Sequence, residues 1–216
     1  MYVNPAFKTE DEAAWDYVAE RGFGAVVAVD NGVPVASQVP LLVTGDGGRR
    51  RIEFHVARPN PLHEVVGRNG RVLVVVSGPD AYISPDWYAS VDQVPTWNYQ
   101  AAHITGFARA IAPEDARAHV DRMSLFFEQR LAPKKPWSTS KMTEAKLAAM
   151  LRAIVPMEIE VERIEASTKL GQNKSIADRM EAARMLAWRG GWGETAVGQA
   201  MRAEIKRDLA RVKEAG

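Results

Sequence analysis

The sequence contains no cysteine among its 216 residues. This absence excludes disulfide bonds, thiolate metal sites and a cysteine nucleophile, and it is typical of proteins in a reducing compartment. The four histidines are isolated from one another, and no two have the helical spacing of a histidine-based metal motif. We therefore expect a cytoplasmic protein without a metal site.

The chain also lacks an excess of charge of one sign and a long apolar run. Its 28 basic and 27 acidic residues give a net charge of +1, so the whole chain has no electrostatic footprint for nucleic acid. The longest strongly apolar runs, at 25–29 and 72–76, have the length of strands and are too short to span a bilayer. The first residues lack the basic and apolar regions of a secretory signal, so we expect no membrane partner.

The hydrophobic pattern predicts an antiparallel β-structure with helices around it. Asn31-Gly32 separates two β-rich runs, and this dipeptide is the strongest short-range signal of a hairpin. Strand patterns occupy 25–30, 33–43, 51–57, 71–78, 98–111 and 157–166, of which 71–78 has the composition of a central strand. Helical patterns occupy a short segment after the capping box Thr9–Glu12, then 61–68, 113–131 and 143–154, and the charged region after residue 174. The order predicts an α+β protein, mainly β, with a closed or nearly closed barrel and a helical tail, and it excludes a Rossmann fold.

Residues 82–106 hold five of the eleven tryptophans and tyrosines of the chain. Trp97 and its aromatic neighbours can supply flat faces, while Thr96, Asn98 and His103 can hydrogen-bond a polar rim, as a planar cofactor requires. A dimer interface collects the same aromatic residues, and the two interpretations are compatible. His103 by itself is more typical of a satisfied strand histidine.

Two further segments carry candidate ligand-binding residues in the first half of the chain. In HVARPNP (55–61), Arg58 offers a planar fork for phosphate and Asn60 adds a neutral donor. Taken alone, this segment is more typical of a helix-capping Asn beside a surface Arg. In ASQVPLLV (36–43), Ser37 and Gln38 interrupt an apolar strand that Pro40 restricts to an edge, and the alternative is an outward polar pair.

The segment STKLGQNKSIADR (167–179) is rich in hydrogen-bond donors and lies between the last strand and a helix. Lys169, Gln172, Asn173 and Lys174 form a candidate anion site. A solvated turn is the alternative.

The chain resembles the PaiB family, the FMN-binding negative transcriptional regulators, in seven segments that occur in the family's order. They are MYVNPAF, ASQVPLLV, HVARPNP, GPDAYISPDWY, VPTWNYQAAHITG, MLRAIVPMEIEV and KLGQNKSIADR, within about residues 1–180. The resemblance implies an FMN-binding split β-barrel, similar to pyridoxamine-phosphate oxidases and flavin reductases, that forms a homodimer with two cofactor sites at the subunit interface. It divides the chain into a split-barrel domain at 1–175 and a helical extension at 176–216.

The same resemblance implies which residues contact FMN. Ser37 and Gln38 would line the isoalloxazine or ribityl region, and Arg58 and Asn60 would hold the phosphate. The remaining residues of the implied cofactor site are His55, Thr96, Trp97, Asn98, His103, Lys169 and Gln172. Gln38 departs from the family, whose motif commonly has histidine there, and glutamine neither titrates near neutral pH nor ligates iron well.

The implied function is that of an FMN-binding negative regulator acting as a homodimer. DNA would contact the C-terminal helix. This helix carries five basic residues between Arg202 and Lys213, but it also carries three acidic residues, so its net positive charge is small. The alternatives on this fold are a flavin-dependent oxidoreductase and a haem enzyme of the piperazate synthase type, for which His55 or His103 would be the axial ligand.

Overall fold

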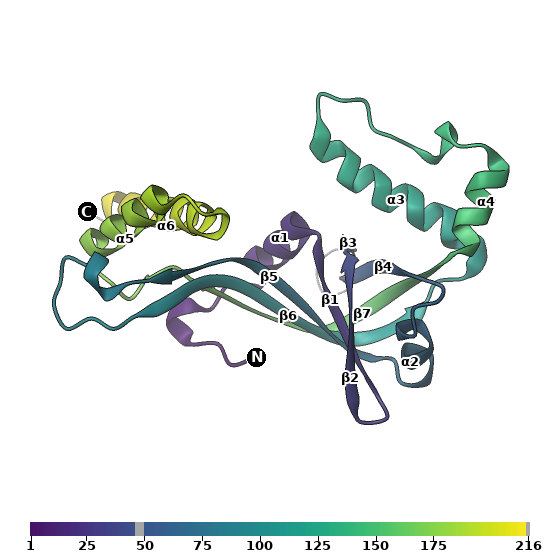
Figure 1. The fold of residues 1–216 in the computed structure, drawn as a ribbon, viewed down its shortest axis with the longest axis horizontal. Helices are drawn as coiled ribbons and strands as arrows, with labels where there is room; N and C mark the ends of the chain where they lie inside the picture. Colours follow the sequence, from purple (N-terminus) through teal and green to yellow (C-terminus); the bar gives the residue numbers. More distant parts are fainter. Residues whose placement is uncertain (46–49, 215–216) are drawn as a thin grey trace. The chain divides into compact units, whose positions relative to one another are not determined.

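The computed structural model describes residues 1–45 and 50–214, which form one seven-stranded sheet and the helices around it (Figure 1). The strands are β1 (Phe23–Asp30), β2 (Val33–Pro40), β3 (Leu42–Thr44), β4 (Arg51–Ala57), β5 (Arg71–Ile83), β6 (Thr96–Ala110) and β7 (Ile154–Lys169). The helices are α1 (Asp11–Arg21), α2 (Leu62–Arg68), α3 (Ala116–Glu128), α4 (Glu144–Arg152), α5 (Ile176–Arg189) and α6 (Trp192–Glu214). The predicted α+β class is confirmed.

The strand order β2-β1-β5-β6-β7-β4-β3 explains how the sheet closes on itself. Its two edge strands, β2 and β3, are consecutive in the chain and are separated only by Leu41. Edges joined through one residue must lie close together, so the sheet has to curl into a barrel. Leu41 is fully buried at this corner, and its backbone N–H donates to the carbonyl of Gly22 at 2.8 Å.

The described residues fall into two compact units that are interleaved along the chain. The terminal unit contains Met1–Ala14, Ser77–Ala102 and Glu165–Gly216, and the central unit contains Trp15–Val76 and His103–Ile164. The strands β5, β6 and β7 each have residues in both units. The predicted boundary at residue 175 stays a prediction.

In the central unit, the β1–β2 hairpin turns where the sequence predicts it. Asn31 and Gly32 both have positive φ, at 50° and 85°, as a two-residue turn of type I′ requires. Gly106 of β6 allows a close approach between strands, because a Cβ atom there would lie 2.2 Å from the carbonyl oxygen of Glu160. β5 is central, as predicted, and Val72, Val74 and Val76 on it are buried.

The terminal unit is built around the helices α5 and α6, which pack against the end of β5. Their shared apolar core consists of Ala81, Ile83, Leu170, Ala182, Ala183, Leu186, Val197 and Met201. Ser175 caps the start of α5 by accepting from the N–H of Asp178 at 3.1 Å, and Gly190 ends the helix in the left-handed conformation. Among the residues that the structure describes, no helix is both long and apolar enough to cross a membrane.

The helix boundaries correct the sequence prediction in detail. The pattern at 113–131 contains α3 flanked by single 3₁₀ turns, and Pro61 precedes α2 instead of forming its first residue. At these ends the backbone keeps right-handed helical φ and ψ angles, at Pro61 as well as at Asp115 and Gln129, so the difference is the usual uncertainty of one or two residues in the assigned boundary.

Candidate functional site

Ser37 and Asn60, predicted from separate motifs, meet in the central unit. Nδ2 of Asn60 donates to Oγ of Ser37 at 2.9 Å, and Oδ1 of Asn60 accepts from the backbone N–H of Leu62 at 2.9 Å. Asn60 therefore joins the edge strand β2 to the start of α2. The capping role that the sequence offered as an alternative is also present, because Asn60 bonds a backbone N–H at the start of this helix.

Gln38 lies beside this pair but is exposed, opposite Ala25 in the β1–β2 register. β2 is an edge strand, as Pro40 predicts. The side chain of Gln38 is thus free to meet a ligand or solvent.

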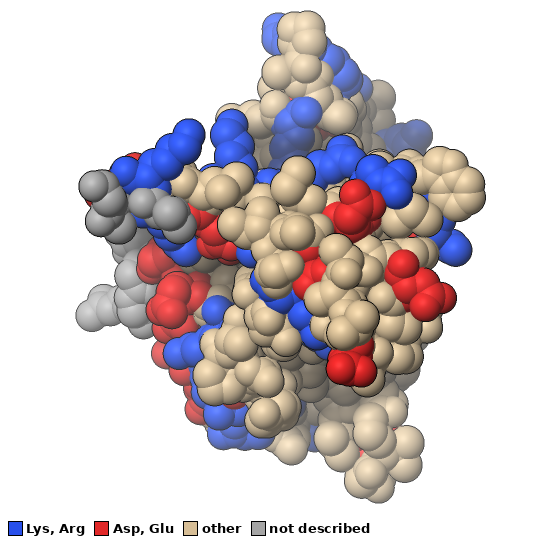
Figure 2. All heavy atoms as spheres, turned by 90° about the vertical axis from the view of Figure 1, so that its left-hand side faces the viewer, with Lys and Arg blue, Asp and Glu red and all other residues tan. Residues whose placement is uncertain are grey.

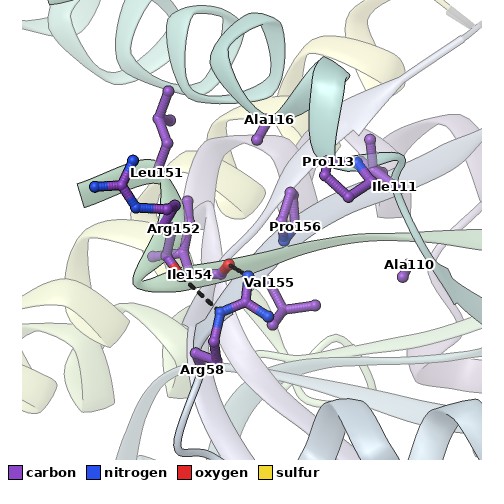
Figure 3. Close-up of a pocket in the computed structure, with 10 residues that line it drawn as sticks. All are labelled: Arg58, Ala110, Ile111, Pro113, Ala116, Leu151, Arg152, Ile154, Val155 and Pro156. Carbon is purple, nitrogen blue, oxygen red and sulfur yellow. Dashed lines mark hydrogen bonds between the residues drawn. The ribbon is translucent and has the colours of Figure 1, made fainter. Parts of the chain in front are cut away.

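The guanidinium of Arg58 bonds to backbone carbonyls of the central unit. Nε donates to the carbonyl oxygen of Arg152 at 2.6 Å, and Nη2 donates to that of Ile154 at 3.0 Å (Figure 3). Asn60 and Arg58 consequently have separate partners in this chain, although the sequence assigned both to one phosphate.

A pocket of about 330 Å³ borders this guanidinium, and its walls are mostly apolar. The pocket is lined by Arg58, Ala110, Ile111, Pro113, Ala116, Leu151, Arg152, Ile154, Val155 and Pro156 (Figure 3). Its volume is at the lower end of small-molecule pockets.

His55, on β4, belongs to a hydrogen-bonded network that the sequence did not predict. Its Nδ1 lies 3.1 Å from Nε2 of His119, and Nδ1 of His119 lies 2.8 Å from Oε2 of Glu53. Nη2 of Arg122 donates to both oxygens of Glu53, at 3.0 and 2.9 Å. We call Arg122, Glu53, His119 and His55 the histidine network.

The two histidines of this network have pKa values below the ordinary value of 6.5. Burial is the main cause for both, since water no longer stabilises the charged ring. The neighbouring His119 lowers the pKa of His55 further, whereas the hydrogen bond to Glu53 opposes the shift of His119. Both rings are therefore neutral at pH 7.

The sequence contains the residues of the histidine network, but they are divided between a strand and a helix that are distant in the chain. Glu53 and His55 alternate on a strand and so share a face, and His119 and Arg122 are three apart on a helix. The histidine predicted on β6, His103, is partly buried in the same unit.

In the terminal unit, the predicted residues Thr96 and Lys169 are in direct contact. Nζ of Lys169 donates to Oγ1 of Thr96 at 2.6 Å and lies 5.7 Å from the centre of the Phe7 ring. Within residues 1–45 and 50–214, no carboxylate forms an ion pair with Lys169. A partly buried ammonium whose described contacts are a neutral hydroxyl and an aromatic ring is suited to an anionic ligand.

The aromatic stretch divides into a packed part and an exposed part. Trp87 and Tyr88 pack against the core of α5 and α6, whereas Trp97 is 54% exposed. Trp97 makes an edge contact with Tyr82, with ring centres 6.1 Å apart. Asn98 is buried, and its Nδ2 donates to Sδ of Met201 at 3.4 Å, so its amide faces the helical core.

Gln172 is used by the turn that follows β7. Its Oε1 accepts from the N–H of Leu170 at 2.8 Å, and its Nε2 donates to the carbonyl of Thr168 at 2.6 Å. This is the local role that the turn alternative describes.

Each unit, taken by itself, offers donor groups that suit an anionic ligand with polar edges. Ser37 with Asn60 offers hydroxyl and amide groups in the central unit, and Thr96 with Lys169 offers hydroxyl and ammonium groups in the terminal unit; the contacts described for these four residues include no carboxylate. Phosphate and the carbonyl edge of a flavin both require such donors. In the part of the chain that the structure describes, no group of three or more histidine, aspartate or glutamate side chains could hold a metal ion.

Comparisons with known proteins agree with the sequence motifs. Residues 1–163 match the family described as "Putative FMN-binding domain". The chain is 35% identical over 187 residues to protease synthase and sporulation protein PAI 2 of Bacillus subtilis, covering 86% of this chain and 89% of that protein.

Two solved structures share the fold at low sequence identity. The FAD and heme binding protein from Mycobacterium smegmatis has a TM-score of 0.56 and 18% identity, covering 85% of this chain and 80% of that one. The flavocytochrome Anf3 from Azotobacter vinelandii has a TM-score of 0.53 and 17% identity, covering 75% and 68%. The predicted split-barrel fold is confirmed.

Proposed function

The chain belongs to the PaiB family of FMN-binding domains, and on this premise we propose that it binds FMN as its cofactor. The observation that carries the proposal is Lys169, a partly buried ammonium bonded to Thr96 in a segment that the family resemblance assigns to the cofactor. Its charge is suited to the phosphate or to an electron-rich edge of the flavin.

We assign the contacts to two groups of residues. Ser37, Gln38 and Asn60 form the first group, and Thr96 and Lys169 form the second. Arg58 can contribute the N–H donors that the carbonyls of residues 152 and 154 do not use, since a guanidinium has five. When bound, the flavin ring supplies the redox chemistry, and the protein supplies position and electrostatics.

An absorption spectrum of the purified protein, followed by a fluorescence titration with FMN, tests this proposal. Lys169→Met should weaken FMN binding by about 10-fold to 100-fold, because a charge-assisted contact is lost. Lys146→Met, on the exposed surface of α4, is the matched control and should bind as the parent does. A protein that takes up no flavin, or shows a Soret band of haem in its place, would refute FMN as the cofactor.

We propose that the protein acts as a homodimer. Tyr82 and Trp97 support this, because they are 46% and 54% exposed and aromatic side chains are enriched at interfaces. Analytical ultracentrifugation should show a dimer, and Trp97→Lys should shift the equilibrium towards the monomer. A monomer at all concentrations would contradict the proposal.

The finer proposal is that of a negative transcriptional regulator, with α6 as its DNA contact. Two of the basic residues of α6 already have acidic partners, since Arg207 pairs with Glu204 and Arg211 with Asp208. Figure 2 shows basic and acidic side chains interspersed on the face at the left of Figure 1, where α5 and α6 are drawn. Family membership therefore supports a role in transcriptional regulation more strongly than the charge of α6 does.

A mobility-shift assay in low salt, where phosphate contacts are strongest, tests the DNA contact. If DNA does not bind even there, the flavin oxidoreductase becomes the better proposal. Oxidation of added NADH or NADPH by the flavin-loaded protein would then identify an enzyme.

A further inference from the structure

The histidine network has a direction that its geometry fixes. Glu53 accepts two hydrogen bonds from Arg122, and a carboxylate oxygen can only accept from the ring of His119. The proton of neutral His119 is therefore on Nδ1, and its Nε2 carries a lone pair. The contact of 3.1 Å to His55 then requires the proton of His55 to be on its own Nδ1.

From this direction we propose that Glu53, secured by Arg122, and His119 are positioning residues that hold His55 with its lone pair on Nε2, as the proton acceptor for an N–H or O–H group of a bound ligand. The second nitrogen of a histidine ring is set by the hydrogen bond that the first one makes. The inference concerns the apoprotein and does not depend on FMN.

Burial makes this arrangement persistent. His119 has no exposed surface and Glu53 is 7% exposed, so each lost hydrogen bond would leave a polar group without water. Both ring nitrogens of His119 are engaged, and the planes of the two histidine rings are nearly perpendicular, at 89°. If the hydrogen bonds of the network ran in the opposite direction, Nδ1 of His119 and Oε2 of Glu53 would place two lone pairs against each other at 2.8 Å.

His55 is the accessible end of the network. It is partly buried, and its Nε2 has no hydrogen-bond partner among residues 1–45 and 50–214. This nitrogen is therefore available to accept a hydrogen bond from a ligand.

Another acid on the same sheet is already neutralised. Glu158 pairs in register with Glu53, but its two oxygens contact Arg51 at 3.4 Å and Arg109 at 2.8 Å. The charged groups that act on His119 are Glu53 and Arg122. Burial, and then the neighbouring His119, lower the pKa of His55, which agrees with an unprotonated Nε2 at neutral pH.

The proposed step is a simple proton transfer. A ligand X–H gives its proton to Nε2 of His55, the X–H bond breaks, and its electron pair stays on X as the anion. The new imidazolium keeps its Nδ1–H bond to His119, and Glu53 stabilises the charge through that ring. No oxidant or further reactant is needed.

Nuclear magnetic resonance of the full protein labelled with ¹⁵N-histidine tests the proposal directly. Long-range ¹H–¹⁵N correlation spectra at pH 7.5 should show His55 and His119 with protonated Nδ1 and unprotonated Nε2. A wild-type His55 with its proton on Nε2 would overturn the proposal, and this result needs no variant.

Glu53→Leu then tests the positioning role. Without the carboxylate, His119 loses the acceptor that fixes its tautomer, and His55 should shift towards the Nε2–H form. Modification of His55 by diethyl pyrocarbonate, located by peptide mass spectrometry, should slow by about fivefold or more because the nucleophilic lone pair is lost. Arg117→Leu is the control. Arg117 lies on α3, as His119 does, but it pairs with Glu144, so this variant should change neither the tautomer of His55 nor its modification rate.

An unchanged His55 tautomer and an unchanged modification rate in folded Glu53→Leu would reject Glu53 as a positioning residue. If that variant does not fold, Arg122→Leu takes its place. Since Arg122 secures the carboxylate but does not touch a ring, this variant should keep both tautomers and raise the pKa of His119. A fall in that pKa would reject the network as described.

Discussion

The side chain of Arg58 donates a hydrogen bond from Nε to the carbonyl oxygen of Arg152, 94 positions later in the chain, at 2.6 Å. The same guanidinium also bonds the carbonyl of Ile154, the first residue of β7. Arg58 thus joins the end of β4 to the connection between α4 and β7, a structural role in addition to any contact with phosphate.

Arg58→Ala should lower the free energy of unfolding by about 1–2 kcal/mol, because two charge-assisted bonds to carbonyls are lost at an exposed position. Urea denaturation measures the change. Arg152→Ala removes a side chain but keeps the carbonyl that Arg58 uses, so it should cost clearly less. Equal losses of unfolding free energy in the two variants would show that the hydrogen bonds of Arg58 do not contribute to stability.

Gly106→Ala should destabilise the barrel by about 1–3 kcal/mol, since the new Cβ would lie 2.2 Å from the backbone oxygen of Glu160 and the strands would have to separate. Gly67→Ala is the matched control. No atom lies within 4 Å of a Cβ at Gly67, which is in α2, so alanine there should be neutral or stabilising by up to about 1 kcal/mol. Thermal or urea unfolding of both variants provides the comparison.

Asp178→Asn should make the stability less dependent on acid pH. The hydrogen bond from the Ser90 hydroxyl is the main cause that lowers the pKa of Asp178 below 3.8, with backbone bonds from Ser90 and Ala89 adding to it. A lowered folded pKa contributes stability above 3.8 that is lost as the pH falls through the folded value. Urea midpoints between pH 6 and about 3 should therefore converge for the parent and the variant. If the urea midpoints of the parent and of Asp178→Asn fell in parallel as the pH was lowered, Asp178 would not be the cause of the acid dependence.

The histidine network should make the protein less stable below pH 6.5. The pKa values of His55 and His119 are both lowered in the folded state, so the unfolded chain takes up protons first and stability is lost as the pH falls. His55→Gln should flatten this loss, measured as the urea midpoint at pH 7.5 and about 5.5.

Local features of the fold could be predicted from the sequence because short-range geometry decides them. Asn31 and Gly32 specify a turn by their tolerance of positive φ, and Pro40 specifies an edge by its missing N–H. The length of β5 was underestimated, because Ser77, Gly78 and Pro79 interrupt the apolar pattern that ends at Val76. Pairing with neighbouring strands extends β5 past this point, and a single sequence does not display that pairing.

The candidate site was predicted as a set of residues more than as a set of contacts. Ser37, Asn60, Thr96 and Lys169 were all named, but which pairs they form depends on the register of distant strands. His119 was missed because it lies 64 positions from His55 and its partners are on another element. Tertiary folding alone brings these rings together.

The interleaving of the two units constrains any attempt to dissect the protein. No single cut frees either unit, because the backbone passes from one to the other several times along β5, β6 and β7. A version shortened at residue 175 would bare Ala81, Ile83 and Leu170 to water, the apolar side chains that α5 and α6 now cover. Such exposed patches invite aggregation, so domain-by-domain expression is a poor route to separating the roles of the barrel and its helices.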